Sequence, residues 1–198
     1  MPSPLKMRPL PYSSPLEGYE SAPPLPTGFT SDGRSLDNFI PGQEYKRSNA
    51  YDEFVDPIDN KGNGFDFHIY YMHTVSTHLE FARKLHERIR REFPELYQLR
   101  IYPMEEFPMG PHPTGSFEVD TFSPHETGTL MTWLVVHRGP LSVLIHPNTD
   151  DELRSHTEHA TWIGERWPVN SDMLQHHRHT TLPRSASISP SAPKDLGE

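Results

Sequence analysis

The sequence predicts an α+β domain in which helices cover one face of a four-stranded antiparallel sheet. Between residues 65 and 167, short aromatic and β-branched stretches alternate with longer ones that repeat apolar residues every three or four positions. The flanking segments, 1–60 and 168–198, have few long apolar runs, and proline or serine dominates parts of both. We therefore expect a largely disordered proline-rich arm over 1–60, a folded domain over 65–167, and a flexible tail over 168–198.

The first half of the domain predicts a strand at 65–72, a helix at 76–91 and a strand at 97–102. The helix is predicted by one apolar stripe, formed by Leu79, Ala82, Leu85 and Ile89. Ser76 is the expected N-cap, because its hydroxyl can accept a bond from a free backbone amide of the first turn.

The second half predicts a proline- and glycine-rich loop over 103–115 and a strand over 116–122. Ser123 then caps a helix that runs to about His137. A strand over 141–146 is followed by a short helix, with Thr149 and Glu152 as an expected capping box. The order β-α-β-β-α-β is that of the ferredoxin-like fold, whose strands usually lie in the spatial order 4-1-3-2.

Alternation along these strands predicts a polar sheet face opposite the helices. The residues expected there are Asp66, His68, Tyr70, Arg100, Tyr102, Ser116, Glu118, Asp120, Ser142, Leu144 and His146. His146, His68 and Glu118 then share this face on three neighbouring strands. Two histidines and one carboxylate form the ligand set of non-haem Fe(II) oxygenases, which keep open positions for substrate and O₂.

Two further histidines belong to the expected site. If strand register moves Glu118 away, His112, in the loop before the third strand, could supply a ligand or a proton-transfer base. His156 lies on the inward side of the short helix and could act as a general base or support a ligand. A polar face that simply meets solvent is the alternative interpretation of the same pattern.

Composition narrows the function classes. The 198 residues include thirteen histidines and no cysteine, so a metal site would use His, Asp, Glu or Tyr. A net charge of -9 and the lack of a long basic cluster argue against nucleic acid as a partner. No apolar run approaches a membrane span and no secretory signal is visible, so a soluble cytoplasmic protein is expected. Phosphate-binding glycine motifs and a Gly-x-Ser-x-Gly elbow are also absent.

Several motifs follow one another in the order of a known family. They are Phe67-His-Ile-Tyr-Tyr71, Gly110-Pro-His-Pro113, Phe117-Glu-Val119, Arg138-Gly139, Leu141-Ser-Val-Leu-Ile-His-Pro-Asn-Thr149, His156 and Trp162-Ile-Gly164. Together they resemble the DOPA 4,5-dioxygenase family of fungi and bacteria over residues 65–167. The resemblance implies a ferredoxin-like fold and extradiol cleavage of the L-DOPA catechol ring by Fe(II) and O₂. The seco-DOPA products would cyclise to betalamic acid or muscaflavin.

With this resemblance, the hypothesis assigns Fe(II) to His68, His146 and Glu118. His112 or His156 would move the catechol proton, and Tyr70 would orient bound oxygen species. Another expectation is that Arg154 or Arg100 pairs with the amino acid carboxylate of the substrate. The family often has His-x-His in the first strand, and here Asp66 replaces the first histidine.

Three alternatives stay open from the sequence. Asp66 could supply the carboxylate of the site, and the substrate could be a different catechol of secondary metabolism. A ferredoxin-like protein without metal could instead bind a small aromatic acid on the polar face. That face could also bind a second subunit in a homodimer.

Overall fold

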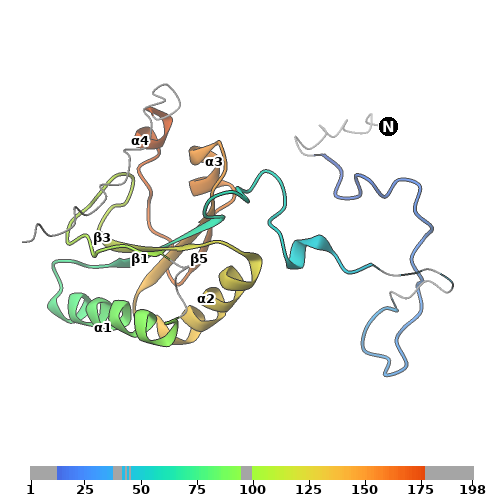
Figure 1. Cartoon of the computed structure of the whole chain (residues 1–198), viewed down its shortest axis with the longest axis horizontal. Coiled ribbons are helices and arrows are strands. Elements are labelled where there is room, and N and C mark those ends of the chain that lie inside the picture. Colours follow the sequence, from blue (N-terminus) through green and yellow to red (C-terminus); the bar gives the residue numbers. More distant parts are fainter. Residues whose placement is uncertain (1–12, 38–41, 43, 45, 95–99, 177–198) are drawn as a thin grey trace, which may run out of the picture. The chain divides into compact units, whose positions relative to one another are not determined.

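The computed structural model describes residues 13–37, 42, 44, 46–94 and 100–176, in two compact units that divide between Arg47 and Ser48 (Figure 1). In the first unit, the described residues form turns and one antiparallel bridge between Phe29 and Leu36. The disorder predicted for 1–60 stays a prediction for this unit. The strand predicted at 97–102 and the tail predicted after 168 fall partly outside the described residues.

The second unit contains a five-stranded antiparallel sheet in the order β2-β3-β1-β4-β5. The strands are β1 (Phe65–Tyr71), β2 (Arg100–Ile101), β3 (Gly115–Thr121), β4 (Ser142–Pro147) and β5 (Thr161–Ile163). The α+β class and the order 4-1-3-2 of the first four strands are confirmed. The fifth strand was not predicted, because three residues are too few to show an alternation.

Helices α1 (Ser76–Glu92) and α2 (Pro124–His137) lie on one face of the sheet (Figure 1). The core between them consists of alternate strand residues and one stripe of each helix: Phe67, Ile69, Tyr71, Ala82, Leu85, Ile89, Phe93, Phe117, Val119, Leu130, Leu134, Leu141, Val143, Ile145 and Ile163. Burial of each large apolar side chain stabilises the fold by about 1.5–3 kcal/mol. The intervening residues of β1, β3 and β4 therefore point to the opposite face.

The opposite face is partly covered. Helices α3 (Glu152–Thr157) and α4 (Ser171–His176) lie on this side of the sheet (Figure 1). Leu174 of α4 is buried, so the folded part of the chain extends beyond residue 167 into the range predicted as tail. The polar strand residues consequently line a partly covered region that stays open to solvent on one side. Within the described residues, no helix has the length and apolar character needed to cross a membrane.

The folded unit also begins earlier than residue 65. Phe54 is buried and its ring lies 5.5 Å from that of Phe65. The Asn60 side chain accepts a bond from the Phe54 amide and donates one to the Phe54 carbonyl, at 2.8 and 2.7 Å. The Asp59 amide donates to the Asn148 carbonyl at 2.9 Å. Residues 48–60, expected within the arm, thus form part of the second unit.

The helix caps agree only partly with expectation. The Ser123 hydroxyl accepts from the Glu126 amide, which confirms the predicted cap of α2. Helix α1 instead has Val75 as its N-cap, without a side-chain bond, and Ser76 is its first residue. In α3 the Asp151 carboxylate caps the Arg154 amide at 3.1 Å, so the Thr149 capping box is wrong. Thr149 lies two residues too early and accepts from the Asp151 amide instead.

Two glycines, one in tight contact with a ring of α1 and one in open space on α2, allow a matched test of the packing around these helices. A Cβ at Gly139 would lie 2.3 Å from the Phe81 ring at a φ of +57°, whereas a Cβ at Gly128, inside α2, meets nothing within 4 Å. We expect Gly139→Ala to lower the free energy of unfolding by about 1–3 kcal/mol through strain and overpacking. Gly128→Ala should raise it by about 0.5–1 kcal/mol. Denaturant titration of both variants checks the pair, and equal effects would contradict this account.

Candidate metal centre

Two buried histidines face each other across β1 and β4. The Nε2 atoms of His68 and His146 are 3.0 Å apart, and the two rings are stacked with an interplanar angle of 21°. Their approach follows from register, because His146 is paired with Asp66, two residues before His68. Alternation puts both side chains on the face opposite the core. The structure thus brings together the two histidines predicted as ligands.

Backbone carbonyls determine which nitrogen of two rings carries hydrogen. Nδ1 of His146 lies 3.1 Å from the Pro147 carbonyl, and Nδ1 of His156 lies 2.9 Å from the Glu152 carbonyl. A carbonyl only accepts hydrogen bonds, so each Nδ1 must donate. In the neutral ring Nε2 is then left with a free lone pair. This tautomer is the one that suits a metal ligand or a proton acceptor.

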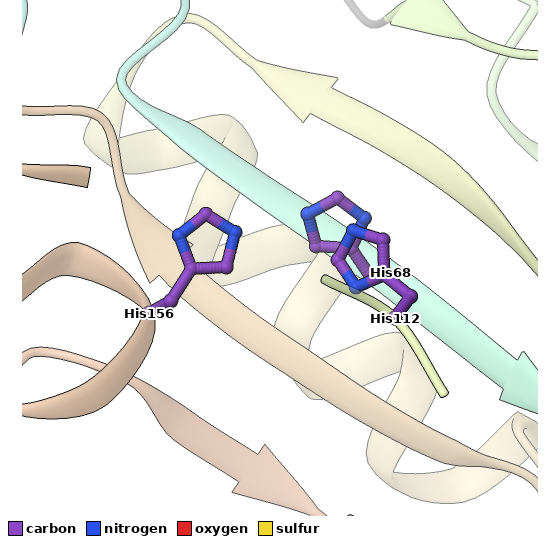
Figure 2. Close-up of side chains that lie close together, drawn as sticks. All are labelled: His68, His112 and His156. Atoms are coloured by element: carbon purple, nitrogen blue, oxygen red, sulfur yellow. The ribbon is translucent and has the colours of Figure 1, made fainter. Parts of the chain in front are cut away.

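His112 and His156 complete a cluster of four imidazoles with His68 and His146, of which Figure 2 shows His68, His112 and His156. The His112 ring, from the loop before β3, is 4.1 Å from the His68 ring, and the His156 ring is 3.8 Å from that of His146. One nitrogen from each of His68, His112 and His156 lies within 4.8 Å of the others. All the predicted histidines therefore converge on one place, although they come from β1, β4, α3 and a loop.

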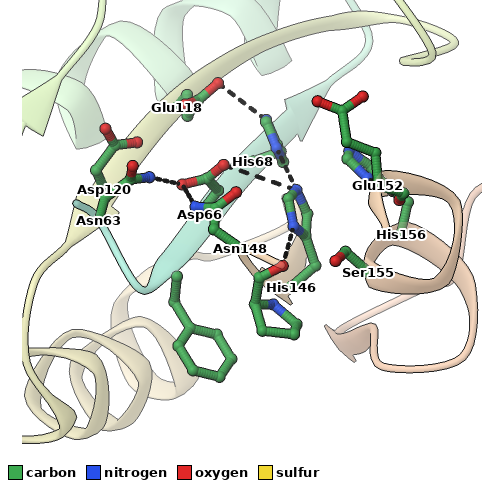
Figure 3. Close-up of polar contacts among 12 residues, drawn as sticks. Asn63, Asp66, His68, Glu118, Asp120, His146, Asn148, Glu152, Ser155 and His156 are labelled. Atoms are coloured by element: carbon green, nitrogen blue, oxygen red, sulfur yellow. Dashed lines mark hydrogen bonds and ion pairs between the residues drawn. The ribbon is translucent and has the colours of Figure 1, made fainter. Parts of the chain in front are cut away.

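The Asp66 carboxylate lies on the His146 side of the histidine pair (Figure 3). Its Oδ2 lies 4.0 Å from Nε2 of His146, and its Oδ1 accepts bonds from the side-chain amides of Asn148, at 2.8 Å, and Asn63. One ligand atom each from Asp66, His68 and His146 lies within 4.8 Å of the others. This trio has the composition of two histidines and one carboxylate.

Glu118 lies on the sheet face predicted for it, and its role as a metal ligand stays a prediction. Its Oε2 lies 3.6 Å from Nδ1 of His68, on the side of the ring away from the nitrogen that faces His146 (Figure 3). Register explains this, because Glu118 is paired directly with His68 across β1 and β3. Glu118 is thus placed to orient His68, while Asp66 takes the position expected for the carboxylate ligand.

The cluster lines a cavity of about 240 Å³. Its walls consist of Asp66, His68, Gly110, Pro111, His112, Glu118, His146, Asn148, Thr149, Glu152, Ser155, His156, Met173 and Leu174. Strands β1, β3 and β4 supply one side, and α3, α4 and the loop before β3 supply the other. A small aromatic molecule can be enclosed by such a space.

Burial keeps the imidazoles uncharged. It lowers the pKa of His146 to about 3 and that of His112 to about 4, and the neighbouring imidazoles act in the same direction. Burial also lowers the pKa values of His68 and His156. Desolvation, reinforced by the Asp120 carboxylate, raises the pKa of Asp66 to about 7. At neutral pH the four rings are therefore able to accept a proton or a metal ion.

Tyr70 supports the cluster from β1. Its hydroxyl lies 2.6 Å from Nδ1 of His112, and its ring meets the edges of Trp162 and Trp167. Burial raises the pKa of the phenol, which stays protonated at neutral pH. Tyr70 therefore reaches the cavity through His112 rather than by lining it.

The two arginines expected to bind a substrate carboxylate do not line the cavity. The side chain of Arg154 runs along the exposed surface of α3, where its Nε donates to Glu158 at 3.0 Å. Arg100 lies on β2, beyond β3, with its guanidinium 5.0 Å from the centre of the Phe122 ring. Their predicted role in binding a substrate carboxylate stays a prediction, because alternation gives the face of a residue but not its distance from the site.

Sequence reasoning missed the two amides that hold Asp66. Asn148 belongs to the Pro-Asn turn after β4, so its proximity to β1 follows once that strand pairing is known. Asn63 precedes β1 by two residues and is buried. No motif identified it, because its role depends only on the path by which the chain enters β1.

The fold and this cluster define an α+β protein with buried His and Asp groups that could hold a metal ion. Residues 65–173, more than half of the chain, match the Dopa 4,5-dioxygenase family. The chain belongs to this family, and the family indicates a dioxygenase, an oxidoreductase that uses O₂.

Two relatives and one solved structure are similar to this chain. The chain is 46% identical to the "Uncharacterized 21.2 kDa protein" of Botryotinia fuckeliana, over 83% of this chain and 91% of that one. It is 33% identical to the DOPA 4,5-dioxygenase of Amanita muscaria, over 57% of this chain and half of that protein's length. A solved structure of a candidate dioxygenase from Nostoc punctiforme has 26% identity and a TM-score of 0.49, covering 58% of this chain and 93% of its own.

The pH dependence of the stability of the metal-free protein tests whether the histidines of the cluster are buried and neutral. Folded His146, with a pKa of about 3, stays neutral between pH 4 and 6, while the unfolded residue takes up a proton below about 6.5. Acid should therefore destabilise the fold. In the wild-type protein the free energy of unfolding should therefore rise with pH in this range. In His146→Asn this slope should be smaller than in the wild type by up to about 1.4 kcal/mol per pH unit.

The slope is measured by denaturation in a chelator at several pH values between 4.5 and 7. His125→Asn, at an exposed position of α2, is the matched control and should keep the wild-type slope. An unchanged slope in His146→Asn would contradict the burial of a neutral imidazole.

Proposed function

We propose that this protein is a non-haem iron extradiol dioxygenase that cleaves the catechol ring of L-DOPA or a related catechol with O₂. The product would be a seco-DOPA or muconate semialdehyde species of the kind that leads to betalamic acid or muscaflavin pigments. The main support is the 3.0 Å separation of Nε2 of His68 and Nε2 of His146, with the Asp66 carboxylate beside them in a cavity.

The donor set suits Fe(II). Two ligands held at about 2.1 Å from an ion and at right angles to each other are about 3.0 Å apart, as the two Nε2 atoms are. Imidazole and carboxylate without sulfur match the facial triad of non-haem iron oxygenases. We assign the ion to His68, His146 and Asp66. Asp66 replaces Glu118 of the sequence-based hypothesis, because Glu118 lies at the other nitrogen of His68.

Bound Fe(II) would hold the two catechol oxygens and O₂ together and lower the pKa of the catechol. The Pro147 carbonyl keeps the lone pair of His146 on Nε2, and Glu118 can accept the hydrogen on Nδ1 of His68. Asn63 and Asn148 occupy Oδ1 of Asp66 and leave Oδ2 toward the histidines. These contacts orient each donor before the ion arrives.

His112 and His156 are the proposed acid–base groups. Each lines the cavity and is uncharged at neutral pH because burial lowers its pKa, so each keeps a lone pair that can accept a catechol hydroxyl proton. Nδ1–H of His112 can donate to the Tyr70 hydroxyl oxygen, which leaves the lone pair of His112 on Nε2. The overall reaction adds both atoms of O₂ to one catechol and needs no further reductant.

Activity tests the proposal directly. Protein loaded anaerobically with Fe(II) should, on addition of L-DOPA and air, consume one O₂ per catechol and form a yellow ring-opened product. Oxygen-electrode and absorbance measurements record both, with metal-free protein as the control. Absence of O₂ uptake with L-DOPA and with a panel of other catechols would exclude the proposed reaction.

The two carboxylates should differ in their effect on iron affinity. Asp66→Asn removes a proposed ligand and should abolish measurable Fe(II) binding or weaken it by more than 100-fold. Glu118→Gln keeps a group beside Nδ1 of His68 and should weaken binding by about 10–100-fold. Anaerobic competition with a colorimetric chelator gives both affinities. A larger loss in Glu118→Gln would reverse the assignment.

A further inference from the structure

Three carboxylates belong to the cavity wall, and among the described residues that form this wall no lysine or arginine occurs. Asp66 lies deep beside the histidine pair, whereas Glu118 and Glu152 lie on either side of His68 (Figure 3). Glu118 is partly exposed and Glu152 is exposed, so both border the part of the cavity that opens to solvent. The two glutamates are supplied by β3 and α3.

Rigid elements hold these two side chains. Glu118 is in the middle of β3, paired with His68 of β1. Glu152 is the first residue of α3, and its carbonyl accepts from Nδ1 of His156 at 2.9 Å. The backbone of each glutamate therefore has a fixed position relative to one histidine of the cluster, His68 or His156. A molecule whose ring reaches the histidines would place its substituent near these carboxylates.

We propose that Glu152, assisted by Glu118, forms a subsite for the ammonium group of a catecholic amine. This inference rests on the proposed ring cleavage and specifies the substrate class: a catechol with a positively charged side chain. An ammonium donor satisfies carboxylate acceptors and forms charge-assisted hydrogen bonds with them. A carboxylate substituent at the same place would be repelled, so the amine group rather than the acid group of an amino acid would be recognised.

The positions of the remaining residues are consistent with this subsite. Arg154, close in sequence to Glu152, is directed to Glu158 on the outer surface of α3. Arg100 lies over the Phe122 ring. The wall from α4 is supplied by Met173 and Leu174, which suit the apolar carbons between a catechol ring and its amine.

A matched set of four catechols provides the test. Dopamine carries a cation, 4-ethylcatechol is its neutral analogue, 3,4-dihydroxyphenylpropionate carries an anion, and L-DOPA carries both charges. Each is titrated anaerobically into the iron-loaded full chain to give a dissociation constant from the catecholate absorption band, and kcat/KM is then measured in air. We expect dopamine to bind about 5-fold more tightly than 4-ethylcatechol, and the propionate about 5-fold more weakly.

Two variants locate the subsite. Glu152→Gln should reduce the ratio of dopamine affinity to 4-ethylcatechol affinity to about 2-fold or less. Glu158→Gln removes the same charge from the outer surface of α3, outside the cavity wall, and should leave the ratio at its wild-type value. Added salt should also reduce the wild-type ratio, because the carboxylates border solvent.

The outcomes separate the subsite from the reaction. Cleavage of 4-ethylcatechol with equal affinity for all four compounds, or with preference for the propionate, overturns the ammonium subsite and leaves the dioxygenase proposal intact. A wild-type ratio in Glu152→Gln also overturns the subsite. If none of the four is bound or cleaved, the proposed function fails and the subsite fails with it.

Discussion

The antiparallel register of β1 with its two neighbours is the constraint on which the site depends. It pairs Asp66 with His146 on one side and His68 with Glu118 on the other. A slip of β1 by one residue would turn Asp66 and His68 toward the core. The same alternation that buries Phe67 between the helices and the sheet therefore presents the proposed metal ligands, and the apolar core fixes the geometry of the polar centre.

Burying the imidazoles of the polar centre costs free energy, and the hydrogen-bond partners around them offset part of this cost. Four imidazoles share one buried region, where burial disfavours the charged form of each ring. Carbonyls of Pro147 and Glu152 and the Tyr70 hydroxyl give three of the rings a hydrogen-bond partner. These contacts orient the free nitrogens toward the cavity, so the groups that make burial tolerable also prepare the site for a metal ion and a substrate.

The sequence was sufficient to predict the faces of the strands, because a period of two needs only local information. It therefore located His68 and His146 correctly and predicted the class of the fold. Distances across strands depend on register, which local patterns do not contain, so the sequence could not show that Glu118 lies at Nδ1 of His68 or that Arg100 lies outside the cavity wall. The sequence also did not predict that α4 covers the polar sheet face or that Asn63 donates to Asp66, because both depend on the path of the chain. Location in the cell and self-association stay predictions.

We infer that one iron ion lies between Nε2 of His68 and Nε2 of His146, with Asp66 as the third protein ligand. An anomalous difference map at the iron edge, from crystals grown anaerobically with Fe(II), tests this arrangement directly. We expect a single strong peak within bonding distance of these three residues. A peak held by His68, His112 and His156 without Asp66, or no peak in the cavity, would contradict it.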